Sequence, residues 1–198
     1  MNYQTICTRT QEIALTAGKF IRDERHKISF TDVETKSKSS LVTYVDTTTE
    51  KMIVQALKSL LPVAGFVTEE GTAGNSGESL MWVIDPLDGT TNYIHGIFPN
   101  SVSIGLIENG EPVMGVVYEV GLNELFYAWK GSPAYLNGNE IKVSKTFISE
   151  DALIGTGFPY CDFDRLEDYI DVLRHLMKNT RGLRRLGSAA ADLCYVAA

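Results

Sequence analysis

Two carboxylates, a glycine and two threonines follow directly after a short apolar stretch of this chain. The stretch runs from Met81 to Ile84, and the residues after it are Asp85-Pro-Leu-Asp-Gly-Thr-Thr-Asn92. Four apolar residues suffice for a buried strand, and the proline is expected to stop it because proline lacks an N–H and favours an extended residue before it. Asp85 is thereby predicted at a strand end, pointing into a loop.

The residues after this proline are suited to binding an anion. Asp88 follows Asp85 by three positions, and Gly89 permits a positive φ or the close approach of a ligand to the backbone. Thr90 or Thr91 could cap a short helix that begins here, and the free N–H groups of such a helix start suit phosphate. The pattern is typical of a metal-bound phosphate site.

A second pair of acids lies upstream. Gly65-Phe-Val-Thr-Glu-Glu-Gly71 predicts a short strand that ends in Glu69 and Glu70. If the two strand ends are neighbours in one sheet, three or four carboxylates converge, and such like charges need cations between them. Oxygen ligands favour Mg²⁺ or Mn²⁺ over zinc. A structural interpretation stays open, since Asp-Pro and Asp-Gly are common turn formers and a Glu-Glu-Gly loop is often only solvated.

Two further segments complete a series of four motifs. Leu41-Val-Thr-Tyr-Val-Asp46 precedes the paired glutamates, and Gly187-Ser-Ala-Ala190 lies near the C-terminus. In this order, the four segments resemble the LVT-x-x-D segment, the glutamate pair, the DPxDGT motif and the C-terminal Gly-Ser segment of the inositol monophosphatase family. The resemblance covers most of the chain. It implies a layered α+β fold, an αβαβ sandwich of the inositol monophosphatase and fructose-bisphosphatase type.

The resemblance also implies a role for each matching residue. Two or three Mg²⁺ ions, with Mn²⁺ as a substitute, would be bound by Glu69, Asp85, Asp88 and the backbone carbonyl of Leu87. The water that attacks phosphorus would be oriented by Glu69 and Thr90, with Asp46 supporting them. Phosphate and substrate would be bound by Asp88, Gly89 and Thr90, and the substrate's alcohol portion would contact Gly187, Ser188 and Ala189.

Phosphomonoester hydrolysis fits these residue types on chemical grounds. The reaction needs an activated water, a stabilised leaving alkoxide and neutralised phosphoryl oxygens, and two metal ions about 4 Å apart can supply all three. The chain offers no candidate nucleophile beside the acids, so direct attack by water is predicted. Inositol monophosphate is the first substrate expected from the resemblance. The alternatives are a related sugar or nucleotide phosphate, or a non-catalytic regulatory or binding homologue, as some bacterial relatives are thought to act on the transcription machinery.

The cysteines and histidines do not form a rival site. Cys7, Cys161 and Cys194 lack CxxC spacing, and His26, His95 and His175 lack metal-ligand spacing. The thiols are therefore expected to be ordinary and reduced. Only His95 follows the acidic motif closely enough to touch a substrate, although a plain loop histidine is the simpler interpretation.

The composition limits the classes of ligand that this chain is expected to bind. The net charge is −7 and the chain has no basic cluster, which argues against nucleic acid as a ligand. The same negative charge would repel a phosphomonoester unless cations invert the local potential. The polar opening lacks the pattern of a signal peptide, and no apolar run approaches the ~20 residues that span a bilayer. A cytoplasmic protein is therefore expected, and the family resemblance implies a homodimer.

The remaining pattern predicts the elements that position these motifs. A helix is expected from about Tyr3 to Arg25, followed by a charged loop through Ser40 in which Lys36 or Lys38 could reach an anionic substrate. Thr47-Thr-Thr-Glu50 reads as a capping box that opens a second amphipathic helix ending at Pro62. Ser101 to Val143 predicts an antiparallel meander. Ser40 stands where many family members carry an acid, so no role is assigned to it.

Beyond Lys145 the pattern predicts strand, helix and strand, and then a helix that opens at Ser188. We therefore expect an N-terminal α+β domain over residues 1–145, carrying the site, and a partial α/β domain over 146–198. The chain ends Tyr-Val-Ala-Ala198 in mid-pattern, whereas family members continue to a further acid and a Trp-Asp pair. This comparison predicts a fragment, or a truncated product, with weakened folding or turnover.

Overall fold

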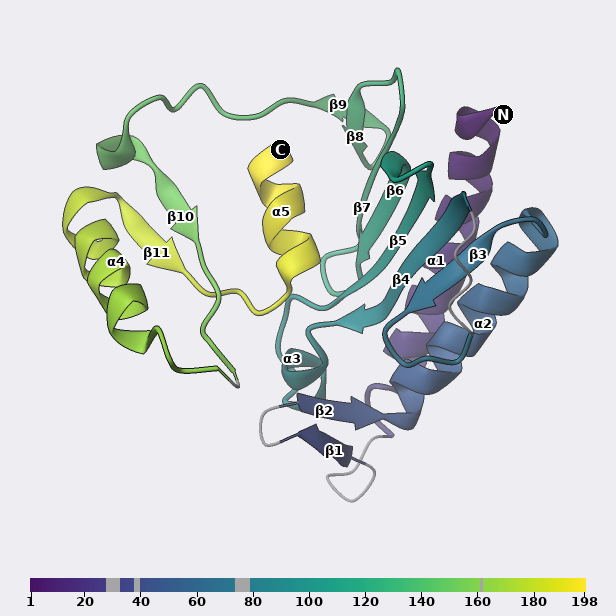
Figure 1. Cartoon of the computed structure of the whole chain (residues 1–198), viewed down its shortest axis with the longest axis horizontal. Helices are drawn as coiled ribbons and strands as arrows, with labels where there is room; N and C mark the ends of the chain where they lie inside the picture. The colour runs from purple at the N-terminus through teal and green to yellow at the C-terminus, as the bar shows by residue number, and fades with distance from the viewer. Residues whose placement is uncertain (28–32, 38–39, 74–78, 161) are drawn as a thin grey trace.

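A seven-stranded sheet forms the centre of the computed structural model, which describes residues 1–27, 33–37, 40–73, 79–160 and 162–198 (Figure 1). Its strands are ordered β3-β4-β5-β6-β7-β8-β9, and only β3 and β4 are parallel. The bounds are Gly65–Thr68 for β3, Leu80–Asp88 for β4, Ser101–Glu108 for β5, Glu111–Glu119 for β6, Glu124–Trp129 for β7, Ala134–Leu136 for β8 and Asn139–Ile141 for β9. The meander predicted after Ser101 is confirmed.

Helices α1 (Tyr3–Glu24) and α2 (Tyr44–Leu60) cover one face of this sheet, and α5 (Ala189–Ala197) lies on the other (Figure 1). Alternate strand residues such as Trp82, Ile104 and Tyr118 are buried beneath α1 and α2. Helix α1 approaches β6 closely at Gly18, where a β-carbon would lie 2.3 Å from Cε1 of Tyr118. The layered α+β fold expected from the sequence is confirmed.

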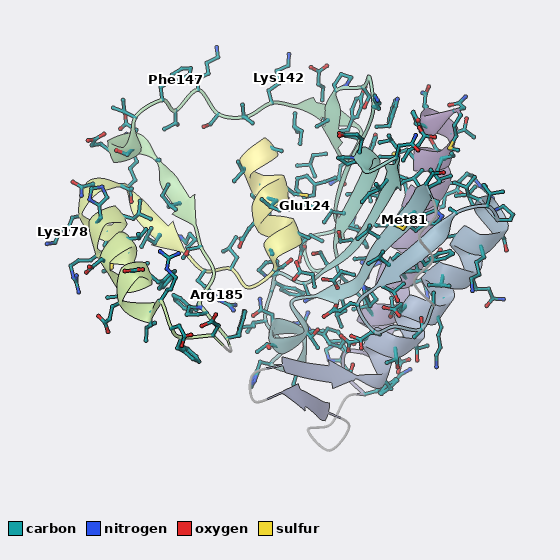
Figure 2. The ribbon with its side chains drawn as sticks, in the orientation of Figure 1. Met81, Glu124, Lys142, Phe147, Lys178 and Arg185 are labelled. Carbon is teal, nitrogen blue, oxygen red and sulfur yellow. The ribbon has the colours of Figure 1, made fainter. Side chains whose placement is uncertain are left out.

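A smaller group of elements follows the long connection after β9. It contains β10 (Leu153–Gly155), α4 (Leu166–Asn179) and β11 (Gly182–Arg184), with β10 and β11 paired in parallel. Lys142 and Phe147 lie along the connection, and Lys178 lies on α4 (Figure 2). The helices and strands predicted after Lys145 are present, and α5 opens with Ser188 as its N-cap. The division into two domains stays a prediction.

Four local predictions are wrong. The first concerns Pro86, which does not stop β4, because the strand continues to Asp88. Asp85 pairs with Ser103 and Asp88 with Ser101, so β4 carries one extra residue between them. Proline is tolerated at such a β-bulge, and a bulge redirects the side chains beside it. Asp85 therefore lies within a strand and not in a loop.

The second concerns the start of α2. Its N-cap is Thr43, and Asp46 completes the capping box by accepting the Thr43 N–H at 2.8 Å. Thr47 and Glu50, which we predicted to form the box, lie inside the helix, and Glu50 is fully buried. A Thr-x-x-acid pattern occurs at both places in this sequence, and the earlier one is used.

The third concerns the segment before Ser40, where β1 (Val33–Ser37) forms an antiparallel pair with β2 (Ser40–Thr43) in place of a continuous loop. The fourth concerns α3 (Thr90–Ile94), which follows β4 as expected but has Gly89 as its N-cap, so that neither Thr90 nor Thr91 caps it. None of the helices within the described residues combines the length and apolar character that spanning a bilayer demands.

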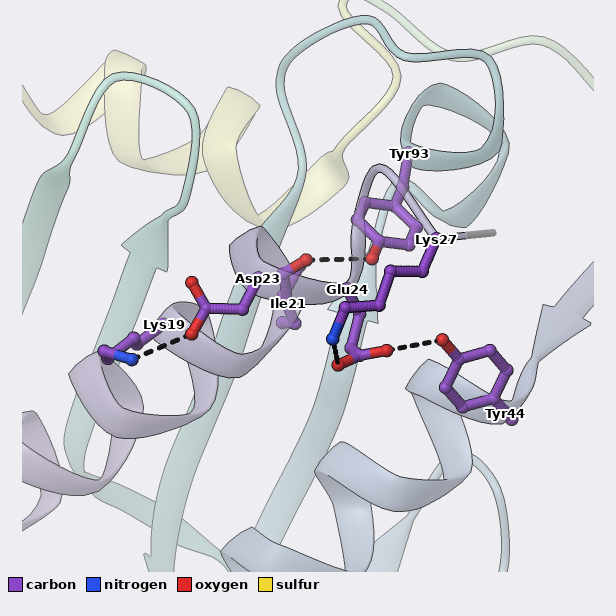
Figure 3. A network of polar contacts seen from close by, with 7 residues as sticks. All are labelled: Lys19, Ile21, Asp23, Glu24, Lys27, Tyr44 and Tyr93. Carbon is purple, nitrogen blue, oxygen red and sulfur yellow. Dashed lines mark hydrogen bonds and ion pairs between the residues drawn. The ribbon is translucent and has the colours of Figure 1, made fainter. Parts of the chain in front are cut away.

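The end of α1 connects α2 to α3 (Figure 3). The hydroxyl of Tyr44, the first residue of α2, donates to Glu24 at 2.6 Å, and the hydroxyl of Tyr93 in α3 donates to the carbonyl of Ile21 at 2.8 Å. Lys27 adds an ion pair to Glu24 at 2.7 Å. The helix that carries Asp46 and the helix that begins at Thr90 are therefore fixed against one common support.

Candidate functional site

The parallel pairing of β3 and β4 brings the two groups of acids together. Thr68 lies opposite Ile84, and the N–H of Glu69 donates to the Ile84 carbonyl at 3.2 Å. Glu69 and Asp85 therefore follow paired residues on adjacent strands, and their side chains are within hydrogen-bonding reach of each other. The two strand ends that carry the acids are therefore neighbours in one sheet, as expected from the sequence.

Asp85 has the largest pKa shift among the carboxylates of the site. Burial, the negative charge of Glu69, a hydrogen bond with Glu69 and the charge of Asp88 raise the pKa of Asp85 to about 9. Its Oδ1 also accepts the N–H of Leu87 at 3.1 Å, which acts in the opposite direction. Asp85 thus accepts a local backbone N–H within the strand and also belongs to an acid cluster to which no described residue adds a positive charge.

Asp88 faces the start of α5. Its Oδ2 accepts the hydroxyl of Ser188 and the N–H of Ala190, both at 2.7 Å. A carboxylate near the N-terminus of a helix is stabilised by the unpaired N–H groups and by the helix dipole. Ser188 is itself fully buried and contacts Ser101 at 2.8 Å. Asp88 therefore connects β4 to the C-terminal helix.

Thr90 and Asp46 form a second polar group beside the acids. The Oγ1 of Thr90 lies 2.9 Å from Oδ1 of Asp46 and 2.9 Å from the Leu87 carbonyl oxygen. The other oxygen of Asp46 accepts both the N–H and the hydroxyl of Thr43. Burial raises the pKa of Asp46, and the hydrogen bonds from Thr43 and Thr90 oppose that shift. Asp46 is almost entirely buried, so it acts on its surroundings through Thr90.

The site offers oxygen donors for a divalent cation but does not hold them around one point. Within the described ranges, no three Asp, Glu, His or Cys side chains stand in a ready-made metal-binding arrangement. The contacts explain this, because Glu69 and Asp85 face each other while Asp88 is bonded to α5. The chemistry of the donors nevertheless fits Mg²⁺, since three carboxylates and the Leu87 carbonyl offer only oxygen. Among the described residues, no cation offsets the charge of Asp85, which agrees with this fit.

Gly89 brings the loop after β4 against the segment before α5. Its φ is +90°, and a β-carbon there would lie 2.9 Å from the Pro99 carbonyl oxygen and 3.1 Å from that of Gly187. Gly187 and Ala189 remain partly accessible beside this contact, whereas Ser188 is buried. The structure thus gathers the predicted substrate segment next to the acids. Its contact with a substrate stays a prediction.

Several predicted residues lie elsewhere or outside the described part. The described part of the chain leaves out the side chains of Lys36, Lys38 and Ser40 and the whole of Cys161. Cys7 and Cys194 are free thiols whose pKa burial raises, to about 11 for Cys194. His26, His95 and His175 are exposed.

Sequence reasoning missed three residues that support the site. The amide of Asn92 donates to the carbonyls of Pro99 at 2.9 Å and Leu186 at 2.8 Å, which joins α3 to the segment before α5. Asp192, in the first turn of α5, has its pKa raised by burial and by the charge of Asp88, and the cation of Arg185 opposes this. Asn92 closes the DPxDGT segment and could have been noticed as a polar residue beginning a helix. Ser101 gave no such signal.

We predict that Ser188→Ala destabilises the protein by about 1–2 kcal/mol. The change removes the N-cap acceptor of the Ala191 N–H, takes away the Ser101 contact and leaves Asp88 with only the N–H of Ala190 at this helix start. Urea denaturation would measure the loss. Ser59→Ala, on the exposed side of α2, is the matched control and should change the stability by less than about 0.5 kcal/mol. Equal stabilities for the two variants would contradict the proposed coupling of Asp88 to α5.

The comparisons with known proteins agree with this geometry. The model of the inositol monophosphatase family matches residues 2–198. The Nus factor SuhB of Pseudomonas aeruginosa is 40% identical over 190 residues, which cover 93% of this chain and 70% of that protein. The fructose-1,6-bisphosphatase/inositol-1-monophosphatase of Aquifex aeolicus is 36% identical over 184 residues, covering 93% and 70%.

The fold matches solved structures as well. The crystal structure of the extragenic suppressor protein SuhB from Bartonella henselae superimposes with a TM-score of 0.90 and 35% identity, and the match covers 98% of this chain and 74% of that one. Sequence and structure thus agree over nearly the whole length. The chain belongs to the inositol monophosphatase family.

Proposed function

We propose that this chain hydrolyses a phosphomonoester with Mg²⁺ as cofactor and inositol monophosphate as the first candidate substrate. The observation that carries the proposal is the acid cluster formed by Glu69, Asp85 and Asp88, in which mutual repulsion and burial raise the pKa of Asp85 to about 9. Such a cluster costs free energy unless protons or cations neutralise it. Family membership supports a phosphatase, and a relative named fructose-1,6-bisphosphatase/inositol-1-monophosphatase supports this substrate class.

Different residues of the site would bind the metal ions, the phosphate and the alcohol portion of the substrate. Glu69, Asp85, Asp88 and the Leu87 carbonyl would hold the ions, which when bound supply charge neutralisation for the phosphoryl group and a more acidic water. Gly89 and Thr90 stand where the first N–H groups of α3 lack intrahelical acceptors and can bind phosphoryl oxygens. Gly187 and Ala189 would contact the substrate's alcohol portion.

Thr90 is the group best placed to orient the attacking water. When its hydroxyl donates to Asp46, the lone pairs of Thr90 remain available to accept a hydrogen bond from that water. Glu69, at the exposed edge of the cluster, is the second group assigned to hold it.

The test is phosphate release from inositol 1-phosphate with and without millimolar Mg²⁺. We expect Mg²⁺-dependent release, and a loss of about 100-fold or more in Asp88→Asn, because that change removes a carboxylate ligand. Fructose 1,6-bisphosphate, measured in parallel, distinguishes the sugar-phosphate alternative. Release that is independent of Mg²⁺ would overturn the proposal.

A second candidate function rests on a relative's name. The Nus factor SuhB of Pseudomonas aeruginosa is 40% identical to this chain, so a regulatory role without turnover is the alternative proposal. Divalent-ion binding without release of phosphate from any tested ester would favour it. The homodimer implied by the family resemblance and the cytoplasmic location expected from the composition stay predictions.

A further inference from the structure

Glu50 is a buried carboxylate with no part in the site described above. It lies inside α2, is fully buried and uses both oxygens on backbone N–H groups. Oε2 accepts the N–H of Glu70 at 2.7 Å, and Oε1 accepts the N–H of Thr72 at 2.8 Å. Burying a charged carboxylate is costly, so such a group is expected to be retained for what it holds.

What it holds is the loop that begins with Glu69. The N–H of Glu69 is bonded to the Ile84 carbonyl of β4, and the next N–H along the chain, that of Glu70, is bonded to Glu50. The backbone on either side of the Glu69 side chain is therefore fixed, on one side to the strand that carries Asp85 and on the other to α2. Without these bonds, repulsion between Glu69 and Asp85 would push the loop away from the sheet.

The same helix also positions the other half of the site. Asp46 precedes Glu50 by four residues, so the two side chains project from one face of α2, one turn apart. Asp46 contacts Thr90, while Glu50 holds the loop that follows β3. Helix α2 therefore carries two buried carboxylates that reach the two loops of the candidate site.

We propose that Glu50 is a positioning residue that holds Glu69 ready for the cation in the metal-free protein. The proposal rests on the metal site of the proposed function. Residues that orient metal ligands from outside the coordination sphere typically contribute 10- to 100-fold to metal affinity, and Glu50 would act in this way through backbone N–H groups. Its loss should therefore weaken metal binding even when the fold survives.

The experiment is a titration of the metal-free full chain with Mn²⁺, followed by electron paramagnetic resonance of the free ion. Glu50→Gln offers only one acceptor oxygen, and its NH₂ group would face one of the two N–H donors. We expect this variant to bind Mn²⁺ about 10-fold more weakly than the wild type. Wild-type affinity in Glu50→Gln would overturn the role of Glu50.

Glu119→Gln is the matched control. Glu119 is also fully buried and accepts two backbone N–H groups, from Asn100 and Leu122, but it lies at the end of β6. The two variants should lose similar stability in urea denaturation, while only Glu50→Gln should lose Mn²⁺ affinity. An equal loss of affinity in both would mean that general loosening explains the effect, which would overturn the proposal.

A second measurement keeps the proposal testable if Glu50→Gln does not fold. In the metal-free wild type, the amides of Glu70 and Thr72 should be protected from hydrogen exchange, and unprotected amides would overturn the role of Glu50.

Failure of the proposed function would give a different set of results. If the wild type binds no Mn²⁺, the metal site and the role of Glu50 both fall, whereas Mn²⁺ binding without phosphate release leaves the role of Glu50 supported and overturns the activity alone.

Discussion

Replacing Asp85 by asparagine should stabilise the metal-free protein at pH 8 and, in the same variant, abolish Mg²⁺-dependent phosphate release. The two effects have one cause, because Asp85 is held in an acid cluster that only a proton or a cation can neutralise. Asparagine keeps an oxygen for the N–H of Leu87, so the hydrogen bond across the bulge at Pro86 survives. At pH 8 the asparagine is neutral without the proton that Asp85, with a pKa of about 9, must bind on folding. The change also removes a carboxylate ligand for the metal.

The direction of the pH dependence follows from the raised pKa of Asp85. This pKa is about 9 in the folded protein and 3.8 in the absence of the fold. Between these values the folded state binds more protons than the unfolded state, so the stability of the metal-free wild type falls as pH rises from about 4 to about 9. The slope from this one group reaches at most about 1.4 kcal/mol per pH unit. The Asp85→Asn protein lacks this slope.

Urea denaturation of chelator-treated protein at several pH values between 5 and 9 would measure the effect. Asp162→Asn is the matched control, because exposed Asp162 accepts the N–H of Asp164 at 2.9 Å in the same kind of turn but in solvent. That variant should keep the wild-type slope. Mg²⁺ should stabilise the wild type more at pH 8 than at pH 5, since it competes with the proton, and it should leave Asp85→Asn unchanged. Parallel pH profiles for the wild type and Asp85→Asn would refute the argument.

The acids of the site could be predicted because they lie in local patterns. Glu69 and Asp85 each follow a short apolar stretch, and the pairing of β3 with β4 then makes them neighbours. The bulge at Pro86 could not be predicted, since it is defined by the register of β4 against Ser101 and Ser103. Proline in a strand interior normally argues against the strand, and here the partner strand accommodates it.

The supporting residues could not be predicted because their partners are distant in the sequence. Glu50 contacts the backbone 20 and 22 residues later, and Ser188 contacts Asp88 across 100 residues. In the sequence, Glu50 completes a Thr-x-x-Glu pattern identical to that of a helix cap. Only the tertiary structure shows that Thr43 starts α2 and that Glu50 serves another loop. Local patterns thus identified the residues assigned to the chemistry, and the fold identified those that hold them.

Asp46→Asn and Thr90→Val should each lower kcat by about 100-fold, and the double variant should lose little more than either alone. In the wild type, Oδ2 of Asp46 serves the N–H and hydroxyl of Thr43, and Oδ1 lies 2.9 Å from the Thr90 hydroxyl. An asparagine that keeps its oxygen on Thr43 turns its NH₂ group toward Thr90. The Thr90 hydroxyl then donates to the Leu87 carbonyl, and the lone pair needed by the water is occupied.

This double-mutant cycle tests whether Asp46 acts through Thr90, as the burial of Asp46 requires. Thr91→Val, an identical substitution at the exposed neighbouring position, is the control and should retain activity. Because both changes break one hydrogen-bonded unit, their effects on the activation free energy should be strongly non-additive. Phosphate release at saturating Mg²⁺ and substrate measures kcat for the wild type, the two single variants, the double variant and the control. Additive losses would show that Asp46 and Thr90 contribute separately, and Thr90 would then need another partner to orient its hydroxyl toward the water.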